Sequence, residues 1–161
     1  MALPARRAPP DALTVLAADH KAVMQLLAEF DELASDQADA PERQSLARQI
    51  CQALTAHAIA TEDIFYPALR EALQDDDLVD DAEAGHDGLR ALVEQIEGMD
   101  ARDERFDALV LVLASAVARH ARHEENEVFP LVRQAGLDLR RLGQRIARRR
   151  DEALLLLADL D

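Results

Sequence analysis

The chain has 161 residues, of which 49% are apolar and 3% aromatic, and its formal net charge is -14 at pH 7. This length suits one domain, and abundant Ala, Leu, Glu and Arg with few Gly predict an all-helical fold with an aliphatic core. The acidic charge opposes phosphate binding and no apolar run approaches the ~20 residues of a membrane span, so we expect neither nucleic acid nor a membrane as a partner.

Residues 1–10 lack the continuous apolar stretch of a secretory signal. We expect them to be a disordered segment ahead of one helical domain over residues 11–161, and we expect the protein to be cytoplasmic. The single cysteine, Cys51, cannot form a disulfide within the chain. It is expected to pack as a small apolar side chain.

The first helix is predicted to begin at Asp11. Asp is a favourable N-cap, and Pro9 and Pro10 disfavour helix in the residues before it. Apolar residues then recur at alternating steps of three and four up to Ala34, which is typical of a helix with one buried face. His20 lies on that face.

The second helix is predicted to follow a turn at residues 35–41, with Pro41 in its first turn. Its inner face carries His57 and, four residues later, Thr61. Pro67 lacks the N–H that the interior of a helix needs, so we expect it to kink or end this helix.

The third and fourth helices are predicted to follow the acidic residues 74–77. The third carries His86 on its buried face, and the fourth presents His120 and Glu124 on its inner face. Pro130 repeats the kink expected at the end of the second helix.

An arginine-rich fifth helix is predicted over residues 137–161. A nucleic-acid element is one interpretation of this basic segment. We favour a helix packed across the bundle, because the rest of the chain is acidic enough to provide partners for its arginines.

The histidines of the first four helices lie at matching distances from the predicted turns. The midpoint between His20 and His57 falls in the turn at residues 35–41, and that between His86 and His120 falls beside the next turn. In antiparallel helices with a common rise, equal distance from a turn means equal depth. The four imidazoles are therefore expected to meet at one level inside a bundle, where they would bind a metal.

The fourth helix supplies the strongest pair of candidate ligands. His120 and Glu124 lie about 40° from each other around a helix, so both can point at one centre. His123, about 60° to the other side, is a secondary candidate. Imidazole and carboxylate without paired thiolates suit iron first and zinc second. We expect one or two iron ions, a pair being bridged by carboxylate and by oxo or hydroxo groups.

The two halves of the chain resemble each other. Residues 57–67 align without gaps on residues 120–130, so that His, Ala, Glu and Pro recur in register. Thr61 stands where Glu124 stands in the second half. Glu62 is a secondary candidate ligand, because it lies about 140° around the helix from the histidine and needs a distorted helix to reach the centre. The second helix therefore predicts a weak iron position, or a water in place of the bridge.

Two neighbouring side chains are expected to lie outside the ligand set. Glu125 repeats Glu62 in register and has the same poor angle, so a solvated carboxylate is expected. Tyr66 lies ~13 Å along its helix from His57, which is expected to be too far for both to bind one metal.

These motifs resemble those of the bacterial hemerythrin-like HHE cation-binding domains. The matching elements are Leu16-Ala-Ala-Asp19-His20, His57-x3-Thr61-Glu62, His86, and His120-x3-Glu124-Glu125 followed by Phe129-Pro130. The resemblance implies an up-down-up-down antiparallel four-helix bundle around a non-haem di-iron site, here with an additional C-terminal helix. It implies that the ligands are His20, His57, His86, His120 and Glu124.

In the family that the chain resembles, the place of Thr61 is usually taken by a second bridging glutamate. This reduced ligand set argues against reversible dioxygen carriage. We expect a non-catalytic iron-binding protein that senses or handles dioxygen, nitric oxide or iron. An iron-dependent stress enzyme or an iron donor for iron-sulfur cluster repair is the first alternative. A bundle that has lost its metal and serves as an interaction module is the second.

Overall fold

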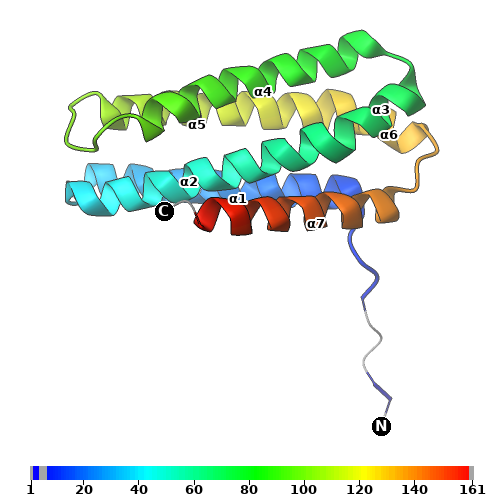
Figure 1. The fold of residues 1–161 in the computed structure, drawn as a ribbon, viewed down its shortest axis with the longest axis horizontal. Coiled ribbons are helices and arrows are strands. Elements are labelled where there is room, and N and C mark those ends of the chain that lie inside the picture. The colour runs from blue at the N-terminus through cyan, green and yellow to red at the C-terminus, as the bar shows by residue number, and fades with distance from the viewer. Residues whose placement is uncertain (1, 4–6, 160–161) are drawn as a thin grey trace.

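The structure is a computed structural model that describes residues 2–3 and 7–159. All the regular secondary structure in these residues is helical (Figure 1). The α-helices are α1 (Ala12–Ser35), α2 (Ala40–Ala60), α3 (Tyr66–Leu73), α4 (Asp76–Glu97), α5 (Phe106–His123), α6 (Phe129–Gln134) and α7 (Leu139–Ala158). Two π-helical turns, η1 (Thr61–Phe65) and η2 (Glu124–Val128), join α2 to α3 and α5 to α6. Residues 1 and 4–6 of the predicted disordered segment lie outside the described residues.

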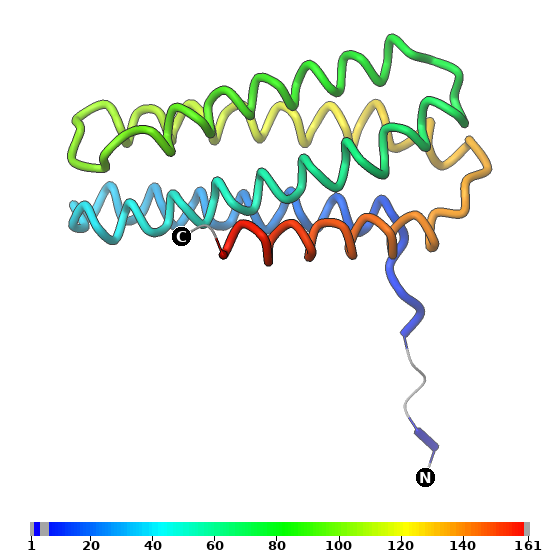
Figure 2. The backbone as a smooth tube through the Cα atoms, in the orientation of Figure 1, coloured from blue at the N-terminus to red at the C-terminus, as the bar shows by residue number. Residues whose placement is uncertain are grey.

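The long helices form an antiparallel bundle, as predicted. Its members are α1, the segment α2–η1–α3, α4, and the segment α5–η2–α6. Figure 1 shows α4 and α5 in one layer and α1, α2 and α7 in the other, and the packing of α7 on both α1 and α2 agrees. In Figure 2, α7 runs back along α1 and α2 from the end of the bundle where α3 and α6 lie. Within the described residues, no helix has the length and apolar character needed to cross a membrane.

Aspartate caps set the beginnings of four helices. Asp11 accepts a hydrogen bond from the backbone N–H of Thr14 at 2.9 Å, which confirms the predicted start of α1. The same contact recurs at the N-termini of α2, α4 and α7, where the capping residues are Asp39, Asp75 and Asp138. Because each cap satisfies a backbone donor that the helix leaves unpaired, it defines where the helical phase begins.

The helices do not end at the two prolines, so of the two outcomes expected at Pro67, a kink or an end, the end is wrong. A π turn precedes each proline instead, and the helix then continues through it. In the first turn the Tyr66 N–H bonds to the carbonyl of Thr61, five residues back. A proline breaks the bonding pattern of an α-helix, and the wider π turn moves that pattern to residues five apart. Thr61 and Glu124 are the first residues of the two π turns.

Two apolar clusters fill the bundle on either side of the histidines. One contains Val23, Phe30 and Phe106, and the other contains Leu16 and Phe65. His20 lies between Leu16 and Val23 on α1, so the polar layer separates the clusters. Cys51 is buried in the first cluster, as expected, and burial followed by the charge of Glu97 raises the pKa of its thiol to about 12.

Helix α7 is held close to the start of α1. Leu142 and Ile146 are buried in the second apolar cluster. A Cβ added at Gly143 would lie 2.7 Å from the backbone nitrogen of Ala12 and 2.8 Å from the carbonyl oxygen of Pro10. A backbone cannot yield as a flexible side chain does, so glycine is required at this crossing.

We expect Gly143→Ala to destabilise the protein by about 1–3 kcal/mol, the usual cost of overpacking. Gly88→Ala is the matched control, because a Cβ at Gly88 meets nothing within 4 Å and both changes raise helix propensity. Urea unfolding of the two variants and the wild type measures the difference. Equal stability of Gly143→Ala and wild type would contradict the close packing of α7.

Candidate metal centre

Four histidines meet in the middle of the bundle, one from each of α1, α2, α4 and α5. Their ring centroids form a closed circuit, with separations of 5.1 Å for His20–His57, 5.9 Å for His57–His86, 4.6 Å for His86–His120 and 5.6 Å for His120–His20. Three of the histidines are buried, and the side chain of His120 is 7% exposed. The matched depths in the sequence therefore placed these residues correctly.

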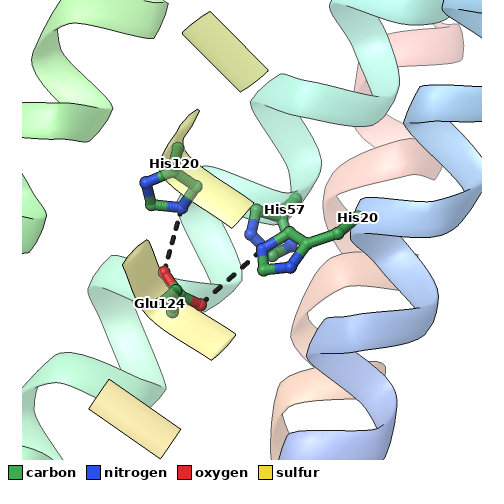
Figure 3. Close-up of side chains that lie close together, drawn as sticks. All are labelled: His20, His57, His120 and Glu124. Atoms are coloured by element: carbon green, nitrogen blue, oxygen red, sulfur yellow. Dashed lines mark ion pairs between the residues drawn. The ribbon is translucent and has the colours of Figure 1, made fainter. Parts of the chain in front are cut away.

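Glu124 lies against this circuit and is completely buried. Its Oε2 is 2.9 Å from His120 Nε2, and its Oε1 is 3.7 Å from His20 Nε2 (Figure 3). One ligand atom from each of His20, His57, His120 and Glu124 lies within 4.8 Å of all the others. His86 adjoins the group, with its Nε2 3.2 Å from His120 Nε2. The carboxylate thus turns one oxygen towards each of two imidazoles.

Several donor atoms in this cluster lack a partner. His20 Nε2, His57 Nε2 and Glu124 Oε1 are buried and have no hydrogen-bond partner within the described part of the chain. Leaving such a polar atom unsatisfied in a protein interior costs about 1–3 kcal/mol. A cation bound between them would satisfy all three. The residues present therefore fit a metal ion.

The protonation states also suit a metal. Burial is the main cause that lowers the pKa of His20 to about 4, and burial likewise lowers the pKa of His86. Burial alone would raise the pKa of Glu124, but the hydrogen bond from His120 and the nearby imidazoles outweigh it and lower the pKa to about 2. At neutral pH the site thus offers imidazole lone pairs and an ionised carboxylate, the forms in which these groups bind metals.

Carboxylates lie behind three of the histidines, on the Nδ1 side. His57 Nδ1 is 3.0 Å from Asp19 Oδ2. His86 Nδ1 is 3.6 Å from Glu62, and His20 Nδ1 is 3.7 Å from Glu125. Of the three, only the His57–Asp19 contact is short enough for a hydrogen bond, and such a bond on the outer nitrogen holds the ring with its other nitrogen directed at the cluster. Glu62 and Glu125 occupy equivalent places in the two halves, which follows from the repeat in the sequence.

The two secondary candidate ligands do not join the cluster. Glu62 lies behind His86 and accepts two hydrogen bonds from Arg90, at 2.7 and 2.8 Å. The proximity of His86, whose Nδ1 lies 3.6 Å away, is the largest of the causes that lower the pKa of Glu62. His123 is 36% exposed and pairs with Glu127 at 2.8 Å. Both side chains follow the angles that a helix imposes, and the π turns do not bring them inward.

Thr61 does not join the cluster, although its counterpart Glu124 does. It is completely buried, and its hydroxyl donates to the carbonyl oxygen of His57 at 2.7 Å. The hydroxyl thus bonds within its own helix, and it has no carboxylate to offer. The half-site on the second helix is therefore unlike the half-site on α5, as the alignment of the two halves predicts.

Tyr66 lies beside the cluster, contrary to the prediction from the sequence. Its hydroxyl lies 3.2 Å from His86 Nε2 and 3.4 Å from Glu124 Oε2, so the expectation that Tyr66 lies too far from the site was wrong. The distance was counted along its own helix from His57. The side chain instead reaches back towards the helix N-terminus and contacts α4 and η2.

A signal for Tyr66 was present in the repeat. It is the only tyrosine of the chain, and it stands opposite Phe129 when the halves are aligned. Burial, followed by the charge of Glu124, raises the pKa of Tyr66, so the phenol is protonated at neutral pH. The phenol oxygen adds an oxygen atom beside His86 and Glu124.

An apolar chamber of about 220 Å³ adjoins the histidines. All four histidines line it, together with Val23, Leu54, Leu89, Val93 and Val117. Its exposed lining residues include Arg90, Glu94 and Glu97, all on α4. Half-buried residues of α2, Thr55, Ala58 and Ile59, complete its lining.

Comparisons with known proteins agree with this geometry. The family model described as hemerythrin HHE cation binding domain matches residues 11–132. A Nostoc protein named DNA nickase is 31% identical over 120 residues, an alignment that spans 74% of this chain and 32% of that protein.

A solved structure shares the fold. It is the crystal structure of a hemerythrin HHE cation binding domain-containing protein from Mycobacterium kansasii, with a TM-score of 0.76, 21% identity, and coverage of 91% of this chain and 89% of that one. The family match over residues 11–132, which hold the five clustered residues, shows that the chain belongs to the hemerythrin HHE cation-binding domain family.

Proposed function

We propose that the buried cluster binds iron, as one ion or two, and presents an open coordination position to a small neutral ligand such as dioxygen or nitric oxide. The observation that carries this proposal is the combination of inward-facing, unpaired Nε2 atoms with an apolar chamber beside them. Bound iron would supply the Lewis acidity and electron exchange that such ligands need. The side chains supply the rest.

The donor set favours iron over zinc. His20, His57, His120 and Glu124 form the cluster, and His86 Nε2 and the Tyr66 hydroxyl adjoin it. If either adjoining group also bound the ion, the donors would exceed the four of a tetrahedral zinc site. All of them are nitrogen or oxygen donors, which suit non-haem iron. Zinc remains the runner-up for the same set of atoms.

The chamber supports a neutral ligand. Its inner wall is formed by aliphatic side chains such as Val93 and Val117. An ion entering it would lose its hydration without gaining a charged partner on that wall, whereas dioxygen or nitric oxide loses little. The chamber walls would keep bulk water away from the cluster while admitting the gas.

We do not propose a DNA-nicking activity, which is the activity that the name of the Nostoc relative gives, for this chain. The alignment spans 32% of that protein, and a net charge of -14 opposes binding to a phosphate backbone. Two arginines of the basic helix α7 are already paired, Arg149 with Asp63 and Arg150 with Asp19. Nucleic acid is therefore not among the partners that we propose.

His120→Ala and Glu124→Gln are expected to reduce iron binding strongly. Removing a residue that only orients a ligand typically costs about 10–100-fold in metal affinity, so loss of a ligand is expected to cost at least as much. His123→Ala is the control, because that exposed histidine lies outside the cluster. Elemental analysis and anaerobic titration with ferrous iron measure the change. Zinc without iron in the wild type, or no metal at all, would overturn the assignment of iron.

Thr61→Glu is expected to raise the number of iron ions bound per chain. The new carboxylate takes the position that matches Glu124 in the other half, where it can reach the weaker iron position. Thr61→Gln controls for the added volume without adding charge. The ratio of iron to protein under identical loading provides the readout, and a ratio that rises equally in both variants would argue against a missing carboxylate.

Val93→Phe is expected to slow the binding of nitric oxide to the iron-loaded protein without lowering its iron content. Val93 lines the chamber and is buried, so the larger ring fills part of the route. Val112→Phe serves as the control, since Val112 is exposed on α5. Stopped-flow absorbance gives the rate, and an unchanged rate in Val93→Phe would show that the ligand enters elsewhere.

A further inference from the structure

Asp19 lies between the metal cluster and the C-terminal helix. Its Oδ2 is 3.0 Å from His57 Nδ1, and its Oδ1 accepts a hydrogen bond of 2.7 Å from Arg150. The carboxylate is 11% exposed. Burial on its own would raise the pKa of Asp19, but its hydrogen bond with His57 and the charge of Arg150 lower it on balance. The three side chains thus form one chain of contacts from α7 to the cluster.

Arg150 joins parts of the molecule that are far apart in the sequence. It lies 131 residues from Asp19, and α7 lies beyond residues 11–132, the part that the family model matches. Its neighbour Arg149 also anchors α7, by a contact of 2.8 Å with Asp63 on η1. The two arginines are similarly exposed, at 32% and 27%. They differ in that Arg150 contacts a residue that touches a histidine of the cluster.

The second half of the bundle lacks this arrangement. The residue before His86, which matches Asp19, is Gly85. A Cβ placed at Gly85 would face His120 Nδ1 at 3.5 Å, so the glycine stands where a carboxylate backs the histidine in the first half. Within the described residues, no helix covers α4 and α5 in the way that α7 covers α1 and α2. The added support belongs to the half-site in which Thr61 replaces a carboxylate.

The chemistry of the contacts explains what this support does. When Asp19 accepts a hydrogen bond from His57 Nδ1, the lone pair of that imidazole is on Nε2, the atom that faces the cluster. Arg150 holds the carboxylate in the position to do so. We propose that Arg150 is a positioning residue that acts through Asp19 on His57, so that docking of α7 and binding of a metal at the cluster strengthen each other. This inference rests on the proposed metal site and does not depend on the identity of the metal.

The test compares Arg150→Gln with Arg149→Gln in the full chain. Each change removes one cationic anchor of α7, so a merely structural role for Arg150 predicts equal effects. Metal-free samples are titrated anaerobically with ferrous iron, and Zn²⁺ is the second probe. We expect Arg150→Gln to weaken binding by about 10–100-fold, the range for residues that orient a metal ligand, while Arg149→Gln stays close to wild type. Arg150→Lys is expected to restore part of the affinity.

Asp19→Asn keeps the test decisive if removal of Arg150 disturbs folding. It leaves both arginines of α7 in place, and it is expected to weaken metal binding to a similar extent. Combining it with Arg150→Gln should add little further loss, because both changes break the same chain of contacts.

Amide hydrogen exchange provides a readout that does not depend on activity. Since coupling is reciprocal, metal should slow exchange in α7 of the wild type and of Arg149→Gln, but not in Arg150→Gln. Equal metal affinities of the two arginine variants, or exchange in α7 that does not respond to metal, would overturn the inference. A wild type that binds neither ferrous iron nor Zn²⁺ would instead overturn the proposed metal site.

Discussion

The buried polar layer is the constraint on which the rest of the structure depends. Four imidazoles and a carboxylate lie between two apolar clusters, where a polar atom without a partner destabilises the fold. The Nδ1 atoms of three histidines face carboxylates, and the inner Nε2 atoms converge on a small volume. Since a cation would satisfy those inner atoms, binding of metal and stability of the bundle are linked. The apolar clusters on either side hold the polar layer in place, and the side chains of this layer form the candidate metal site.

The two halves of the bundle carry different residues at equivalent positions. Both have a histidine on each helix and a π turn before a proline, and the π turns begin at the aligned residues Thr61 and Glu124. The half on α5 contributes Glu124, a carboxylate with an oxygen towards each of two histidines. The half on α2 has Thr61 there, but Tyr66 reaches the cluster and Asp19 with Arg150 supports His57. An internal repeat has thus become an asymmetric site, in which the weaker half draws on a helix outside the bundle.

Much of the fold and of the candidate site could be predicted from the sequence. Helical periodicity gave the helices, Asp11 gave the start of the first, and equal distances from the turns gave the common depth of the histidines. The poor angle assigned to Glu62 agrees with its place behind His86. The sequence left open whether Pro67 kinks or ends its helix, because the rule for α-helices leaves out the π turn that accommodates a proline. Tyr66 was misjudged because its distance was measured along one helix, whereas its partners lie on α4 and η2.

The sequence by itself determined the all-helical class, the positions of the helices, the layer of histidines and the difference between Thr61 and Glu124. These properties are local, since they depend on spacing within one helix or on symmetric distances from a turn. The tertiary structure decided which atoms meet: Tyr66 with His86, Glu62 with Arg90, and Arg150 with Asp19. Such contacts depend on how separate helices pack and on the rotation that a π turn introduces, and no periodicity within a single segment contains that information.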